Sequence, residues 1–250
     1  MSAALQTIGL HKRFGGLVAT NDVTLTLAHG ARHALIGPNG AGKTTFVNQL
    51  TGVLAPDAGQ VLLGGIDITR LGRTQRVRLG LGRTFQINQL FGDLTPVESI
   101  GLAVSERMRG GGDFWRGLGT RRDIAREIAE LIERFGLGDV MALPTRDLSY
   151  GKQRLLEIAI ALAGAPRVLL LDEPAAGVPE AERQDLLDTL GRLPRDVSIL
   201  LIEHDMDLVF SFAERISVLV NGGLFADGTV AEIMAHPGVR AVYLGGDEHG

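Results

Sequence analysis

Residues 37–45 read Gly37-Pro38-Asn39-Gly40-Ala41-Gly42-Lys43-Thr44-Thr45. This run follows the pattern G-x-x-x-x-G-K-[ST], in which glycines let successive backbone N–H groups converge on a phosphate and the lysine adds a positive charge. Apolar residues 34–36 indicate the end of a buried strand, and residues 44–50 indicate a helix whose first turn adds unpaired N–H groups. Since strand, loop and helix are the context that the pattern requires, the run predicts an α/β core that binds a nucleotide.

Two side chains of this phosphate loop (residues 37–45) have separate expected roles. We expect Lys43 to contact the β- and γ-phosphates, and the Thr44 hydroxyl to join the coordination shell of a Mg²⁺ that keeps most of its waters. The chain has only three lysines, at positions 12, 43 and 152, so Lys43 does not reflect a lysine-rich composition. The alternative is a chance match, which the flanking strand and helix disfavour.

Composition narrows the class of protein. A chain of 250 residues, with 45% hydrophobic and 22% charged residues, is long enough for one large domain or for a core with a subdomain. The absence of cysteine excludes disulfides and thiolate metal sites, and a net charge of -4 gives no electrostatic reason to expect a nucleic acid partner. We expect no signal peptide, and no apolar stretch approaches the roughly 18 residues of a membrane span. Any work at a membrane would then depend on other chains.

Periodicity separates a β-rich N-terminal part from a helical middle part. Alternation of apolar and polar residues over 5–10 and 23–27 predicts half-buried antiparallel strands. Helical signals dominate residues 87–165. We expect this part to form a helical insert in a nucleotide-binding core that consists of residues 1–86 and 166–250.

Three or more helices are expected in the insert. Thr95-Pro96-Val97-Glu98 has a threonine cap, proline at the first helical position and glutamate at the third. An apolar stripe over residues 121–135 predicts the second helix. The third is expected after Ser149-Tyr150-Gly151, with apolar residues of 155–162 facing inward.

Two short apolar runs end in titratable side chains. Residues 168–171 lead into Asp172 and Glu173, and residues 199–202 lead towards His204. Runs this short and apolar suit strands that are buried on both faces of a parallel sheet, where ligands bind at the C-terminal ends of the strands. We therefore expect these three side chains to lie on the same edge as the phosphate loop.

Each of the three side chains has a role that ATP hydrolysis would require. Hydrolysis needs a metal clamp and a group that orients the attacking water. We expect Asp172 to bind Mg²⁺ directly or through water, Glu173 to polarise the attacking water, and His204 to contact the γ-phosphate. Without the phosphate loop, a solvated turn or a polar residue at a strand end would explain them equally well or better.

In this order and at this spacing, the motifs resemble those of ABC-type ATPases, the nucleotide-binding subunits of ATP-binding cassette transporters. The matching features are Phe14 as the aromatic that stacks on adenine, the phosphate loop, Gln86 as the sensor of Mg²⁺ and of the transmembrane partner, residues 148–153 as the signature motif, residues 168–173 as the second nucleotide motif, and His204 as the switch histidine. The resemblance implies one ABC-type ATPase domain over residues 5–250. Its fold would be α/β, with a P-loop NTPase (RecA-like) core and a mostly parallel sheet, an N-terminal antiparallel β subdomain and an inserted α-helical subdomain.

The resemblance also implies a mechanism and partners. Two ATPase subunits, identical or related, would hold each ATP and its Mg²⁺ between the phosphate loop of one and Ser149 and Gly151 of the other. The side chains implied in hydrolysis are Lys43, Gln86, Glu173 and His204, and those implied at the metal are Thr44, Gln86 and Asp172. The further partners implied are transmembrane permease chains and, indirectly, a solute-binding protein. The chain would lie peripherally on the cytoplasmic face of the inner (plasma) membrane.

Narrower features are similar to the ATPases of branched-chain amino acid importers, a branch that also serves related amides and urea. They are Arg-Thr-Phe-Gln at 83–86, Leu-Ser-Tyr-Gly at 148–151, Pro-Ala-Ala-Gly at 174–177 and the stretch 242–246. The alternatives are an export ATPase of the lipopolysaccharide type and a soluble ABC-type ATPase without a transport role. Three departures from the family pattern are Lys152, where glutamine is usual, Pro179, where an aspartate commonly reaches across the dimer, and Phe14, where tyrosine is more frequent.

Overall fold

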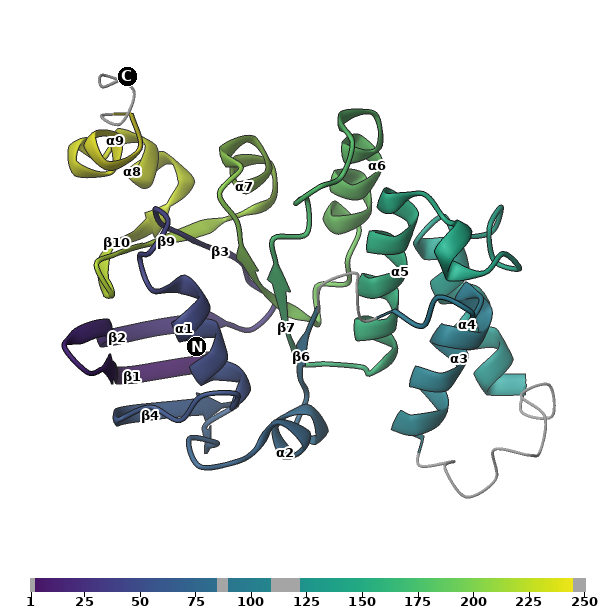
Figure 1. Ribbon diagram of the computed structural model, residues 1–250, viewed down its shortest axis with the longest axis horizontal. Helices are drawn as coiled ribbons and strands as arrows, with labels where there is room; N and C mark the ends of the chain where they lie inside the picture. Colours follow the sequence, from purple (N-terminus) through teal and green to yellow (C-terminus); the bar gives the residue numbers. More distant parts are fainter. Residues whose placement is uncertain (1–2, 85–89, 109–121, 245–250) are drawn as a thin grey trace. The chain divides into compact units, whose positions relative to one another are not determined.

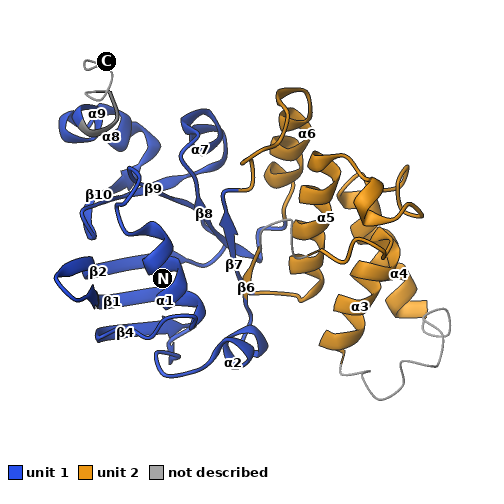
Figure 2. Ribbon diagram, viewed as in Figure 1, with its two compact units in different colours: residues 1–81, 167–173, 194–250 blue, residues 82–166, 174–193 orange. Residues whose placement is uncertain are grey.

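The computed structural model describes residues 3–84, 90–108 and 122–244 (Figure 1) and divides into two compact units. Unit 1 comprises Met1–Leu81, Arg167–Glu173 and Pro194–Gly250, and unit 2 comprises Gly82–Pro166 and Pro174–Leu193 (Figure 2).

An antiparallel sheet forms the N-terminal part of unit 1. Its strands, in spatial order, are β2 (Leu17–Ala28), β1 (Ala3–Phe14), β4 (Ala58–Leu63) and β5 (Ile66–Asp67). The alternating apolar side chains predicted this sheet, because Leu5, Val23, Leu25 and Leu27 are buried in its core. The antiparallel β subdomain is thus confirmed, with strands longer than the alternation indicated.

A second, mostly parallel sheet carries the strand that enters the phosphate loop. Its strands, in spatial order, are β10 (Gly223–Thr229), β9 (Arg215–Val220), β3 (Arg32–Ile36), β8 (Ser198–Ile202), β7 (Val168–Asp172) and β6 (Leu81–Arg83). Strand β3 pairs in parallel with β8 and β9, and β7 pairs in parallel with β8, whereas β9 and β10 form an antiparallel hairpin. Residues 168–171 of β7 and every residue of β8 are buried, as the two apolar runs predicted, and every residue of β3 is buried too.

The described helices of unit 1 are α1 (Lys43–Thr51), α2 (Arg73–Arg78), α7 (Met206–Phe212), α8 (Val230–Ala235) and α9 (Pro237–Leu244). The prediction of α1 is confirmed. Helix α1 buries Phe46, Val47 and Leu50 in the main core of unit 1. This burial fixes the helix whose first turn follows the phosphate loop.

A buried arginine holds the other end of α1. Arg76 of α2 is 1% exposed, and its guanidinium donates hydrogen bonds to the carbonyls of Gln49 and Leu50, at 2.7 and 2.6 Å. It also donates to the carbonyls of Thr69 and Leu71, at 2.8 and 2.9 Å. Burial lowers the pKa of Arg76, and the charge of nearby Asp67 partly opposes that shift. The last carbonyls of a helix lack partners within it, and Arg76 supplies hydrogen bonds to two of them, although the Gln49 carbonyl also accepts the Gly52 N–H at 3.4 Å.

A chain of polar side chains ties β3 to the β9–β10 hairpin. Ser217 Oγ donates to Asp227 Oδ2 at 2.5 Å, and His33 Nε2 lies 2.8 Å from Ser217 Oγ. Since the one hydroxyl proton of Ser217 goes to Asp227, Ser217 accepts from His33. Arg215 donates to the other oxygen of Asp227. Partial burial alone would raise the pKa of Asp227, but the hydrogen bonds from His33, Ser217 and Arg215 outweigh it and hold that pKa far below its usual value.

We expect Asp227→Asn to lower the free energy of unfolding by about 1–2 kcal/mol at neutral pH, because bonds to a charged acceptor are lost. A depressed pKa contributes stability above the unfolded-state pKa, which is about 3.8, and this contribution disappears as the pH falls towards the folded-state pKa. The difference between wild type and variant should therefore narrow below about pH 4. Urea unfolding between pH 7 and pH 3 measures it, with the exposed Asp185→Asn as control. A difference that is constant with pH would contradict the assignment.

Unit 2 is mainly helical in its described residues. Its helices are α3 (Pro96–Arg107), α4 (Arg122–Arg134), the short 3-10 helix η3 (Thr145–Asp147), α5 (Tyr150–Ala163) and α6 (Glu180–Gly191). The capping signature is confirmed, since Thr95 and Glu98 cap α3 reciprocally. The stripe of α4 is confirmed too, since Ile124, Ile128, Leu131 and Ile132 are all buried. Helix α6 was not predicted.

Candidate functional site

The phosphate loop connects β3 to α1, and its glycines meet two different demands. Gly40 and Gly42 have φ values of 78° and 100°, in the left-handed region that favours glycine. A Cβ at Gly42 would lie 2.2 Å from the carbonyl oxygen of Ala19, and one at Gly37 would lie 2.3 Å from that of Leu219. Backbone from β2 and β9 therefore packs directly against the loop. The sequence motif predicted the tight turn but not this close approach.

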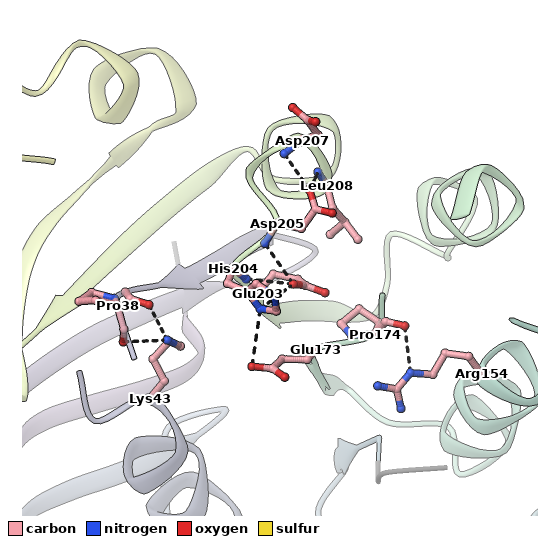
Figure 3. A network of polar contacts seen from close by, with 11 residues as sticks. Pro38, Lys43, Arg154, Glu173, Pro174, Glu203, His204, Asp205, Asp207 and Leu208 are labelled. Carbon is pink, nitrogen blue, oxygen red and sulfur yellow. Dashed lines mark hydrogen bonds and ion pairs between the residues drawn. The ribbon is translucent and has the colours of Figure 1, made fainter. Parts of the chain in front are cut away.

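The Lys43 side chain folds back onto the first residues of the phosphate loop. Its Nζ atom donates to the carbonyl oxygens of Gly37 and Pro38, at 2.5 and 3.1 Å (Figure 3). Burial lowers the pKa of Lys43, and the charges of Glu173 and Asp172 oppose that shift. The ammonium thus lies within the electrostatic reach of both carboxylates, as expected for one edge of a parallel sheet.

Asp172 and Glu173 follow each other at the end of β7. Asp172 is the last residue of the strand, and the N–H of Glu173 donates to the Ile202 carbonyl at 2.9 Å. Glu173 has a φ of 46°, which is uncommon for a residue with a Cβ, and backbone conformations of this kind cluster at functional sites. The structure therefore holds Glu173 in a sparsely populated conformation directly beyond the sheet.

His204 lies close to the Glu173 side chain. Its Nδ1 atom is 3.8 Å from Glu173 Oε1 (Figure 3). The two side chains are 63% and 47% exposed, so both are accessible to a ligand in solution. The structure thus brings together Lys43, Asp172, Glu173 and His204, as the apolar runs predicted.

A functional role for Glu203 was not predicted from the sequence. Its carboxylate is 1% exposed and accepts the backbone N–H groups of His204 and Asp205, at 2.9 and 3.3 Å (Figure 3). It also lies 3.6 Å from His204 Nδ1. Asp205 in turn caps α7 by accepting the N–H groups of Asp207 and Leu208. These contacts fix the loop that presents His204, and the only sequence signal was the cluster of polar residues after β8.

The remaining predicted residues of the nucleotide site vary in exposure. Phe14 ends β1 with 49% of its surface exposed, and Lys12 Nζ is 5.8 Å from the centre of its ring. In the loop, Asn39 and Thr44 are exposed, whereas Ala41 is buried and Thr45 is half-buried. Gln86 lies outside the described residues.

The signature residues lie at the start of α5, in unit 2. Ser149 is the N-cap, and its hydroxyl accepts the Lys152 N–H at 3.4 Å. The expected anion donors, Ser149 Oγ and the Gly151 N–H, both contact Glu182 Oε2, at 3.1 and 2.7 Å. The Lys152 ammonium, which departs from the family pattern, donates to Asp139 at 3.0 Å and to the carbonyl of Gly136 at 2.5 Å.

A sequence model described as ABC transporter matches residues 20–176. The chain belongs to the ABC transporter family. A second model, described as branched-chain amino acid ATP-binding cassette transporter, matches residues 224–249. Members of the ABC transporter family bind and hydrolyse ATP through this domain, so the chain is an ABC-type ATPase. No helix among the described residues is both long and apolar enough to cross a membrane.

Relatives within the ABC transporter family match over the full length. The high-affinity branched-chain amino acid transport ATP-binding protein BraF of Pseudomonas aeruginosa is 40% identical, over 96% of this chain and 97% of that protein. LivG of Escherichia coli, described in the same words, is 39% identical over 98% and 99%. The crystal structure of the ADP conformation of MJ1267, an ATP-binding cassette of an ABC transporter, superposes with a TM-score of 0.82 at 28% identity, over 98% of this chain and 99% of that one. The predicted fold class is thus confirmed.

Proposed function

We propose that the chain is the ATP-hydrolysing subunit of an importer for branched-chain or related amino acids. The full-length similarity to BraF and LivG carries this proposal, and the match of residues 224–249 to a branched-chain amino acid family supports it. No observation favours the lipopolysaccharide-type exporter or a role without transport. The domain division proposed here assigns residues 1–86 and 166–250 to nucleotide binding and residues 87–165 to the signature-bearing insert.

The mechanism that we propose begins with the phosphates. Lys43 and the N–H groups of the phosphate loop bind the triphosphate, and the adenine stacks on Phe14. The exposed Thr44 hydroxyl and the Asp172 carboxylate suit Mg²⁺, which takes few protein oxygens and keeps its waters. Bound Mg²⁺ would neutralise charge that develops on the phosphates. Gln86 is proposed as a further group at this metal.

Hydrolysis in this mechanism depends on Glu173 and His204. The Glu173 carboxylate accepts a proton from the attacking water, and its left-handed backbone sets the direction of the side chain. His204 contacts the γ-phosphate, while the buried Glu203 holds its backbone in position. The Glu173 carboxylate and the His204 side chain are thereby in position before ATP binds, so these groups need little reorganisation during the reaction.

The proposed assembly contains a second ATPase subunit whose Ser149 and Gly151 cover the bound γ-phosphate. Permease chains would anchor the pair at the cytoplasmic face of the plasma membrane, and a solute-binding protein would deliver the amino acid. Deleting the gene should abolish high-affinity leucine uptake by intact cells, and the wild-type gene but not a Lys43→Ala copy should restore it. Leucine uptake that is unchanged by the deletion, with loss of uptake of another solute, would overturn the amino acid assignment.

Lys43→Ala should weaken ATP binding to the isolated chain by about 10- to 100-fold, because charge-assisted bonds to the phosphates are lost. Titration of a fluorescent ATP analogue measures this affinity. Lys152→Ala is the matched control, because its ammonium is bound to Asp139 in unit 2. Equal weakening by both variants would mean that Lys43 has no special role at the phosphates.

A further inference from the structure

The signature residues already hold an anion that belongs to the chain itself. Glu182, in the first turn of α6, accepts the Gly151 N–H at 2.7 Å and the Ser149 hydroxyl at 3.1 Å through a single oxygen, Oε2. All three residues belong to unit 2. We call this contact the carboxylate latch (Ser149, Gly151 and Glu182).

The latch fits closely around the start of α5. A Cβ at Gly151 would lie 2.1 Å from Glu182 Oε2, so only glycine allows the carboxylate to approach this near. Tyr150 packs against the loop between β7 and α6, since a Cβ at Gly177 would lie 2.9 Å from the Tyr150 hydroxyl. Ser149 is exposed, Glu182 is half-buried and Gly151 is buried, with its N–H covered by the Glu182 carboxylate.

We propose that Glu182 is an internal competitor for the γ-phosphate and must leave the signature donors before a second subunit can deliver its nucleotide there. This inference rests on the proposed function, in which Ser149 and Gly151 bind that phosphate. One N–H group cannot serve the carboxylate and a phosphate oxygen together, and the two anions repel each other at contact distance. Rotation of the Glu182 side chain exposes the donors without any change of the backbone.

A purely structural role for Glu182 makes a different prediction. Ser149 already caps α5 through the Lys152 N–H, so the helix start has a partner without Glu182. If the carboxylate only supported the signature, its removal would loosen the donors and weaken dimerisation. If it competes, its removal raises the fraction of subunits whose donors are available and strengthens dimerisation in proportion to that fraction. In a pair of identical subunits this factor applies at both sites.

The test uses the Glu173→Gln chain, which is expected to bind ATP without hydrolysing it. Glu182→Gln and Glu182→Ala are added separately, and the dimer dissociation constant is measured in Mg-ATP by sedimentation. We expect the dimer to become about tenfold tighter with Ala and less so with Gln, which keeps one neutral acceptor. Affinity of the monomer for an ATP analogue should not change, because the phosphate loop is intact. Glu180→Gln is the control, since this exposed residue removes the same charge from the same helical turn.

The possible outcomes distinguish failure of the carboxylate latch from failure of the proposed function. Dimers of unchanged or weaker affinity in both Glu182 variants, with normal unfolding midpoints, overturn the latch and leave the ATPase assignment intact. Equal tightening by Glu180→Gln also overturns it, because general charge would then be the cause. If no variant dimerises in Mg-ATP while all bind the nucleotide, the shared nucleotide site fails and the latch fails with it. Should Glu182→Ala not fold, the isosteric Glu182→Gln decides.

Discussion

Glu173→Gln is expected to lower the rate of ATP hydrolysis by about 10²- to 10⁴-fold, the range for removal of a general base. Glutamine has the same shape but cannot take a proton from the attacking water. Binding of ATP should remain close to that of wild type, because Lys43 and the phosphate loop supply it. The uncleaved nucleotide should then trap a dimer, whereas the wild-type chain should be largely monomeric without nucleotide.

Phosphate release after rapid mixing with ATP measures this rate, and light scattering reports the dimer. A second variant, Glu173→Gly, separates activity from stability, because residue 173 has a φ of 46°. Glycine accepts this conformation freely, so the glycine variant should lose activity while unfolding at the same or a slightly higher denaturant concentration. Hydrolysis at the wild-type rate in either variant would mean that another group activates the water.

Arg76→Met is expected to have the largest effect on stability, a loss of about 3–5 kcal/mol in the free energy of unfolding. Methionine fills much of the volume but leaves four carbonyls without the guanidinium, two of them at the end of α1. Arg76→Lys should recover only part of the loss, because one ammonium cannot reach all four.

Urea unfolding of the apo chain measures the loss, and Arg78→Met is the control because Arg78 is exposed on the same short helix. Nucleotide affinity should fall with Arg76→Met as well, since α1 begins at the phosphate loop. A change below about 1 kcal/mol would show that solvent replaces the guanidinium at these carbonyls.

Much of this fold follows from local patterns. The glycine-rich run predicted the β3–α1 connection, and Thr95 with Glu98 predicted the start of α3. The apolar runs before Asp172 and His204 predicted that the two side chains would lie on the same edge of the sheet. Short strands without polar residues are buried in a parallel sheet, whose strands all end at that edge. In each case a few neighbouring residues suffice to specify the structure.

The features that were not predicted depend on contacts between distant residues. Helix α6 buries only Leu186, Thr189 and Leu190, so its apolar stripe is too narrow to stand out in the sequence. Helix α2 buries an arginine instead of an apolar side chain. The latch joins residues that are 33 and 31 positions apart, and a glutamate in a helical first turn usually serves only the helix.

The pairing of β3 also determines when the nucleotide site can exist during synthesis. Arg32 pairs with Ile199 and His33 with Arg215, so the strand that enters the phosphate loop gains its two neighbours only from residues far along the chain. A ribosome that has translated the phosphate loop must add well over a hundred further residues before either neighbour emerges. The nucleotide site is therefore completed only when translation is nearly finished, and ATP in the cell cannot assist the early stages of folding.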